Sequence, residues 1–182
     1  MPGDGRSLGR SLRVWRTLKG IKQSHAAELL RVSQGTISRW ESGALAPDAD
    51  EQASLRDLLG ARLDGAADRA LARLIEQSPA RVHLVCDITH NLLAASPRRT
   101  ASWGLGFAEL RGRSLWRYAT PEIVAAENRL AENGWFERGP PVVSITTGAN
   151  RSNEVPIEPS TLTWTRFQLS DGSFARLAET LE

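Results

Sequence analysis

The chain has 182 residues, of which 41% are hydrophobic and 24% charged, so it can form one large or two small domains with apolar cores. Its single cysteine, Cys86, excludes an intrachain disulfide and a multi-cysteine zinc site, and no run of about eighteen apolar residues predicts a membrane span. The net charge of +2 is unevenly distributed: residues 1–46 carry eight Lys or Arg against three acids, whereas residues 47–182 carry fifteen against eighteen. This asymmetry predicts an N-terminal phosphate-binding domain followed by a second domain with another function.

The N-terminal region predicts a short tail followed by a helix. Residues 1–7 are rich in glycine, lack the apolar core of a signal peptide, and are expected to be disordered in a cytoplasmic protein. From Ser7 to Lys19, large apolar residues recur at spacings of four and three, as in a buried helical stripe. Three basic residues lie off that stripe or just beyond it, and they suit either DNA phosphate contacts or an ordinary solvated face: Arg13, Lys19 and Lys22.

The segment from Gln23 to Gly43 predicts two helices joined by a tight turn. Alanines and leucines give the first helix a small-residue face, and Ser33 is a suitable N-cap for the second. Ile37 and Trp40 form the buried side of the second helix. The remaining faces of this helix carry side-chain types that hydrogen-bond to base edges, namely Gln34, Thr36, Ser38 and Arg39.

Two stretches of this segment resemble the phage Cro and repressor type of DNA-binding domain, the Xre family. They are Lys-Gly-Ile-Lys-Gln before the first helix and Ser-Gln-Gly-Thr-Ile-Ser-Arg-Trp-Glu-Ser-Gly through the second. The resemblance spans Leu8 to Leu59. It implies a helix-turn-helix in which the helix of residues 33–42 reads the major groove of a double-stranded DNA operator. A pair of packed helices in an ordinary bundle is the alternative.

The same resemblance assigns roles to single residues. It implies that Gln23 binds a phosphate and that Arg16 and Glu41 form an ion pair between the first helix and the end of the third. Gly35 stands where a base-contacting side chain often lies. Because one such domain makes few contacts, it also implies a homodimer on paired half-sites. The side chains that it places in the major groove are Gln34, Thr36, Ser38 and Arg39.

Two further helices are predicted before the second domain. Asp48 caps a helix that ends at Leu59. Residues 62–77 form another helix with an apolar stripe, which suits a dimer seam, a strut between domains, or packing against its own domain. Ser78-Pro79 then marks a boundary.

From residue 80 onward the pattern predicts an α+β domain. Alternating apolar residues indicate strands at 82–88 and 91–96, several short helical signals follow, and a longer helix starts at Pro121 and runs to about Asn133. Three strands close the chain, at 142–147, 161–169 and 174–181. A hairpin, a helical crossover and a three-stranded meander make one five-stranded antiparallel sheet.

This second region resembles the PAS sensor fold over residues 81–181. The resemblance rests on Val-Cys-Asp-Ile-Thr-His-Asn-Leu-Leu-Ala-Ala-Ser as the opening hairpin and on a Glu-Leu-x-Gly-x-Ser-Leu pattern in the helical segment. It implies a domain for sensing or for dimerisation.

We expect no enzymatic activity. Asp87 and His90 suit an acid–base pair, but they flank a predicted hairpin turn, where an exposed pair that stabilises the turn is favoured. No phosphate-binding loop, nucleophile elbow or His-x-x-x-His motif is present. His83 and Cys86 lie on opposite faces of a strand, so they do not chelate one metal ion.

No cofactor is expected either. The cysteine motif of flavin-binding PAS relatives is absent, and residues 121–138 contain no histidine of the kind that holds haem in such domains. An uncharged or weakly polar small molecule remains, with Arg117 or Arg166 as the nearby charge; an aromatic core without a ligand is the alternative. The candidate wall residues are Trp103, Trp116, Tyr118 and Trp164.

The sequence therefore predicts four segments: a disordered tail (1–7), a helix-turn-helix domain (8–60), a connector helix (61–79) and a PAS-like domain (80–182). The function that fits them is a sequence-specific transcriptional regulator. A protein-interaction adaptor or antitoxin-like component, whose second domain binds a protein partner, is the alternative.

Overall fold

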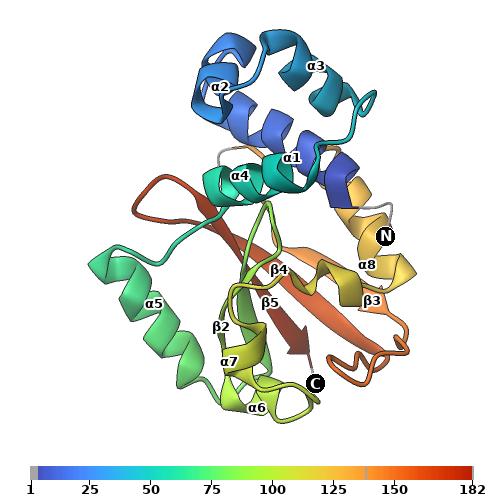
Figure 1. Cartoon of the computed structure of the whole chain (residues 1–182). Coiled ribbons are helices and arrows are strands. Elements are labelled where there is room, and N and C mark those ends of the chain that lie inside the picture. Colours follow the sequence, from blue (N-terminus) through green and yellow to red (C-terminus); the bar gives the residue numbers. More distant parts are fainter. Residues whose placement is uncertain (1–3, 138, 182) are drawn as a thin grey trace. The chain divides into compact units, whose positions relative to one another are not determined.

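The computed structural model describes residues 4–137 and 139–181 and divides the chain into two compact units, Met1–Gly60 and Ala61–Glu182. The first unit is entirely helical and the second combines helices with one sheet (Figure 1). The predicted fold class, a helix-turn-helix bundle followed by an α+β domain with a five-stranded antiparallel sheet, is confirmed. No helix within the described ranges is long and apolar enough to cross a membrane.

Four helices form the first unit. They are α1 (Asp4–Leu18), α2 (Gln23–Leu30), α3 (Gln34–Ser42) and α4 (Ala49–Leu59). Helix α1 begins at Asp4, so the predicted disordered tail is wrong for residues 4–7, while residues 1–3 lie outside the described residues. The helices enclose a core of fully buried apolar side chains, which includes Leu12, Ile37, Trp40 and Leu55.

Helix α1 approaches α3 closely because Gly9 has no side chain. A Cβ atom at Gly9 would lie 2.1 Å from the carbonyl oxygen of Trp40, closer than van der Waals contact allows. The indole of Trp40 is itself only 1% exposed. This contact fixes α3 against the first helix and leaves its opposite side at the surface.

The sheet of the second unit has the strand order β2-β1-β5-β4-β3 and is antiparallel throughout. A hairpin opens the sheet, a helical crossover follows it, and three strands close the chain as a meander, as the sequence predicts. The strands are β1 (Val82–Cys86), β2 (Leu92–Ala95), β3 (Val143–Thr147), β4 (Ser160–Gln168) and β5 (Phe174–Leu181).

The crossover helices cover one face of this sheet. Helix α8 is shorter than predicted: it ends at Asn128, and turns occupy the next residues instead of the predicted helix to Asn133. Large buried side chains, including Leu110, Leu130 and Trp135, fill the space between these helices and the strands. The crossover elements are α6 (Pro97–Thr100), α7 (Phe107–Leu110), η1 (Leu115–Tyr118) and α8 (Pro121–Asn128).

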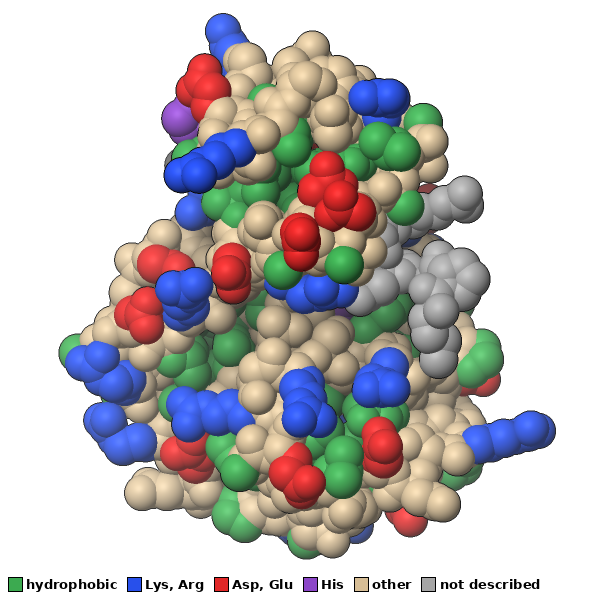
Figure 2. Space-filling view, viewed as in Figure 1, with side chains coloured by type: hydrophobic (Ala, Val, Ile, Leu, Met, Phe, Trp, Pro, Cys, Tyr) green, Lys and Arg blue, Asp and Glu red, His purple; other side chains and the backbone are tan. Residues whose placement is uncertain are grey.

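Helix α5 (Ala66–Glu76), predicted as part of a connector, packs on the other face of the sheet. Its Ile75 belongs to a buried cluster with Leu84 and Cys86 of β1. The carboxylate of Asp68 accepts hydrogen bonds from the backbone and hydroxyl of Ser170, both at 3.0 Å. Arginines occupy the outer side of α5, where Figure 2 shows Lys and Arg side chains at the surface. Of the roles that the sequence left open, the structure supports packing within the second unit.

Candidate nucleic-acid interface and ligand cavity

Local chemistry sets the position of α3. The hydroxyl of Ser33 accepts a hydrogen bond from the backbone N–H of Thr36 at 3.0 Å, which caps the start of the helix. Gly43 ends it with φ 74°, a left-handed conformation that glycine adopts without strain. Ile37 and Trp40 anchor the helix in the core. The remaining faces of α3 are therefore held rigidly at the surface.

The four predicted base-contacting residues are all on α3, but they are not equally available. Gln34, Ser38 and Arg39 are exposed, whereas Thr36 is half-buried. The hydroxyl of Thr36 lies 2.8 Å from that of Ser33 and is engaged at the helix cap. Gln34, Ser38 and Arg39 are thus accessible to a partner, while the hydroxyl of Thr36 is held at the helix cap.

A chain of hydrogen bonds joins this surface to the core. The Nε2 of Gln34 donates to the Oε1 of Gln23 at 2.6 Å, and the Nε2 of Gln23 donates to Glu41 at 2.9 Å. Because a carboxylate only accepts, Glu41 fixes which end of the Gln23 amide faces Gln34. The first polar residue of α2 and the first of α3 are therefore oriented together.

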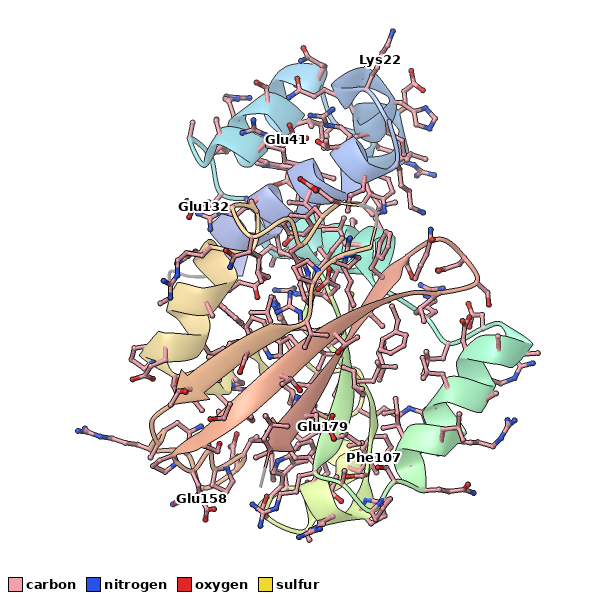
Figure 3. The ribbon with its side chains drawn as sticks, turned by 180° about the vertical axis from the view of Figure 1, so that it is seen from behind. Lys22, Glu41, Phe107, Glu132, Glu158 and Glu179 are labelled. Atoms are coloured by element: carbon pink, nitrogen blue, oxygen red, sulfur yellow. The ribbon has the colours of Figure 1, made fainter. Side chains whose placement is uncertain are left out.

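Arg16 completes the chain with the predicted ion pair. Its guanidinium donates through Nε and Nη2 to the two carboxylate oxygens of Glu41, at 2.7 and 3.0 Å, and through Nη1 to the carbonyl of Ile21 at 2.9 Å. The hydrogen bonds that Arg16 donates to Glu41 raise the pKa of Arg16. Burial alone would raise the pKa of Glu41, but its hydrogen bonds with Arg16 and Gln23 lower it. Glu41 lies among the helices of the first unit in Figure 3.

The predicted phosphate contacts differ in how they are held. Arg13, Lys19 and Lys22 are exposed, and Lys22 extends outward at the start of α2 in Figure 3. The ammonium of Lys19 lies 5.7 Å from the ring centre of Trp15. Gln23 is half-buried and fixed by Glu41. A DNA phosphate backbone would therefore meet three exposed cationic side chains and the oriented amide of Gln23.

The second unit contains a cavity of about 80 Å³ between the sheet and the crossover helices. All four predicted wall residues, Trp103, Trp116, Tyr118 and Trp164, line it. The two charged residues predicted near it, Arg117 and Arg166, are not part of its lining. Arg117 is exposed and lies over the ring of Tyr118, and Arg166 pairs with an aspartate in the core.

Two other arginines line the cavity, Arg99 and Arg176. Arg99 follows β2 on a short helix, and Arg176 is on β5. Sequence reasoning missed both, although arginine at an otherwise apolar strand position, as in Ala175-Arg176-Leu177-Ala178, signals a buried charge.

The interpretation of Asp87 as half of an exposed pair at a turn is wrong. Its side chain is fully buried and accepts hydrogen bonds from Arg166 at 2.8 Å, from Arg176 at 2.9 Å and from the indole of Trp135 at 3.1 Å. Arg166 and Arg176 are direct neighbours across β4 and β5. Asp87 therefore holds two buried cations together at the centre of the sheet.

His90 belongs to a second part of the same network. It adopts a positive φ of 58° in the turn after β1, and its ring stacks on Trp116 with centroids 4.6 Å apart. Its Nε2 lies 3.5 Å from Glu127, which also binds Arg176. Both His90 and Asp87 thus have structural partners, and no group of three His, Cys, Asp or Glu residues in the described chain has a geometry that holds a metal ion.

Glu127 makes the second unit sensitive to acid. Burial alone would raise its pKa, but the charge of Arg176 and the hydrogen bonds from His90 and Arg176 lower it to about 2. A carboxylate with a folded pKa below its unfolded value stabilises the fold above the unfolded pKa, and that contribution is lost as the pH falls. The stabilisation that Glu127 contributes is therefore lost as the pH decreases from about 4.5 to about 2.

The matching experiment compares Glu127→Gln with the wild type. Between about pH 5 and pH 3 the wild type is expected to lose up to about 2 kcal/mol more of unfolding free energy than the variant, because glutamine has no proton to take up. Urea unfolding at both pH values measures this difference, and Glu132→Gln, at an exposed position, is the control. Parallel acid losses in wild type and Glu127→Gln would contradict the assignment.

Comparison with known proteins identifies a helix-turn-helix match that covers most of the first unit and continues into α5. Residues 7–72 match a family model described as a helix-turn-helix domain. The first unit is a helix-turn-helix domain. The match covers about a third of the chain, and no curated protein sequence matches the chain.

Solved structures similar to this chain include PAS domains and light-oxygen-voltage proteins. The PAS domain of the HTR-like protein from Haloarcula marismortui is 21% identical, with coverage of 63% of this chain and 96% of that one and a TM-score of 0.44. The PAS-B domain of Cycle from Drosophila melanogaster, with bound ethylene glycol, is 19% identical (56% and 97% coverage, TM-score 0.43). An RNA-binding light-oxygen-voltage receptor is 13% identical (97% and 59% coverage, TM-score 0.45).

Proposed function

We propose that this protein is a sequence-specific transcriptional regulator of the Xre type, in which α3 reads the major groove of an operator and the PAS-like second unit senses a small molecule or joins two chains into a homodimer. In this proposal the protein acts in the cytoplasm and catalyses no reaction.

The observation that carries the proposal is the hydrogen-bonded chain from Arg16 through Glu41 and Gln23 to Gln34. Long polar side chains at a surface normally lose rotamer freedom when they bind, and this loss weakens affinity. Here, the core ion pair orients Gln23, and Gln23 orients Gln34, before any partner arrives. A phosphate ligand at Gln23 and a base ligand at Gln34 would thus meet side chains that are already positioned.

The exposed residues of α3 supply the base-reading chemistry. Arg39 has a guanidinium suited to the two acceptors of guanine, and Gln34 has an amide suited to adenine. The side chain of Arg39 lies along its own helix and donates to the carbonyl of Gly35 at 3.3 Å. A Cβ atom at Gly35 would meet only Ser33, at 3.8 Å, so the backbone of α3 is open to close approach at this position.

Arg39→Ala tests this role. The full chain is first used to select binding sites from random duplexes, and the affinity of each variant is then measured on the selected site and on a scrambled site at one salt concentration. Arg39→Ala is expected to lose about 1–3 kcal/mol on the selected site and little on the scrambled one, because base contacts carry the specificity. Gln23→Ala, which removes a phosphate contact, is expected to weaken both sites alike.

Equal losses on both sites for Arg39→Ala would contradict base reading by this residue. The selected sequences also report the assembly state. Paired half-sites one helical turn apart, about 34–36 Å, indicate a homodimer, whereas single unpaired sites indicate that one chain binds alone.

A further inference from the structure

Four side chains that line the cavity of the second unit have a buried polar atom without a hydrogen-bond partner within the described structure. One of these atoms, Nε2 of His90, lies 3.5 Å from the carboxylate of Glu127. The other three are Nδ1 of His83, Nε of Arg99 and Nε1 of Trp103. The rings of His83 and Trp103 are 6.2 Å apart, and Trp103 follows Arg99 by four residues. Buried polar groups are nearly always hydrogen-bonded, so a cluster of three unsatisfied atoms around one cavity indicates a missing partner.

The cavity also carries a positive charge that the described residues do not neutralise. The guanidinium of Arg99 donates through Nη1 to the hydroxyl of Thr180 at 3.1 Å, and no carboxylate pairs with it within 4–137 or 139–181. Burial, and then the charge of Arg81, lower the pKa of Arg99 to about 10, so it is still charged at neutral pH. Arg99 is half-buried, with its Nε inaccessible to solvent, and a partly buried charge without a counter-ion is unfavourable, so an anion in the cavity would stabilise it.

The other titratable groups of the cavity wall do not change this balance. Arg176 is offset by Asp87 and Glu127. Burial, and then the charge of Arg99, lower the pKa of His83 well below its usual value, so the imidazole is neutral and carries one N–H. Among the described residues, the positive charge of Arg99 is therefore the one that faces the cavity without a paired carboxylate.

The size and the rest of the lining limit the anion. A cavity of about 80 Å³ is roughly half of the 150 Å³ that accepts benzene, which corresponds to about three to five non-hydrogen atoms. Beyond the polar cluster the wall is mainly apolar, with side chains from β1, η1, α8, β4 and β5 such as Val85, Leu115, Ile123, Leu162 and Ala178. These surfaces favour a short hydrocarbon tail on the anion.

We propose that the cavity binds a small monocarboxylate, with its carboxylate against Arg99, Trp103 and His83 and its short acyl tail against the apolar wall. The proposal rests on the sensing role given above to the second unit, and it replaces the uncharged ligand expected from the sequence. A phosphate dianion would leave one negative charge buried and uncompensated, and water would satisfy the N–H groups but leave the charge of Arg99 unpaired.

Calorimetric titration of the full chain with sodium propionate tests the proposal. Propionate is expected to bind at one site per chain at millimolar or lower concentration, while its neutral isostere propionamide binds at least about tenfold more weakly because it does not pair with the guanidinium. Inorganic phosphate is expected not to compete. No binding of propionate at millimolar concentration, equal binding of propionamide, or competition by phosphate would each overturn the proposal.

Substitutions locate the site. Arg99→Met removes the charge and keeps an unbranched apolar side chain, and it is expected to weaken propionate binding about tenfold or more. The control is Arg98→Met, at the neighbouring exposed arginine of the same helix, which is expected to bind as the wild type does. Trp103→Phe keeps the ring but removes the N–H, and a several-fold loss is expected. Trp103→Phe decides the outcome if Arg99→Met does not fold, and wild-type affinity in Trp103→Phe would overturn the assignment.

The same protein preparations are tested for DNA binding without propionate. Specific DNA binding without carboxylate binding would remove this proposal and leave the DNA-binding role of the first unit intact. Carboxylate binding without specific DNA binding would retain the cavity assignment and remove the proposed function.

Discussion

Asp87→Ala is expected to lower the free energy of unfolding of the second unit by about 3–5 kcal/mol, because removal of one partner from a buried ion network leaves the other charges unpaired. Asp87 is the acceptor shared by Arg166 and Arg176, and all three side chains are at most 2% exposed. Glu127 would still offset Arg176 in the variant, but Arg166 would lose its only carboxylate in the described residues. This loss would be a large fraction of the stability of a domain of this size.

Scanning calorimetry of the full chain measures the effect, since unfolding of two units need not be a single transition. The transition of the second unit should move to a lower temperature in Asp87→Ala and remain in place in Asp171→Ala, an exposed aspartate in the turn between β4 and β5. An Asp87→Ala protein that melts like the wild type would show that the buried network contributes little.

Glu41→Ala is expected to cost the first unit up to about 3 kcal/mol, the lower end of the range for a buried pair. The side chain of Glu41 is 5% exposed and that of Arg16 is 19% exposed, so partial hydration of Arg16 offsets some of the loss. The variant also removes the acceptor that fixes which end of the Gln23 amide faces Gln34. Both the melting temperature and the affinity for DNA should therefore fall.

Two companion variants separate these effects. Glu41→Gln retains an acceptor for Gln23 without the charge, and it should keep more of the DNA affinity than Glu41→Ala at a similar loss of stability. Glu28→Ala, at an exposed glutamate on α2, should change neither. An unchanged melting curve for Glu41→Ala would contradict the structural role of the ion pair.

The helix-turn-helix was predictable because local chemistry specifies it. The Ser33 cap, the Ile37 and Trp40 stripe and the Gly43 terminus all lie within residues 33–43, so their spacing in the sequence is enough to predict the helix. The hairpin and the meander of the second unit were also accessible, since they join strands that are neighbours along the chain, whereas the pairing of β1 with β5 was not predicted.

The charges of the second unit were not predictable in this way. Asp87 is 79 and 89 residues from its partners, and the register between β4 and β5 alone brings Arg166 beside Arg176. The aromatic residues of the cavity wall were predicted from the sequence because such residues are rare and large. Nothing in the sequence distinguishes Arg99 from its neighbour Arg98. Periodicity does not distinguish an arginine that faces a cavity from its exposed neighbour.

The central claim, that α3 reads a base sequence, is tested most directly by the ratio of affinities of the wild-type chain for its selected duplex and for a scrambled duplex of the same length. We expect the selected duplex to bind at least about 10³-fold more tightly at physiological salt, with both affinities falling as salt rises. Equal affinities for the two duplexes across the salt series would contradict the claim, because binding would then depend on phosphate charge alone.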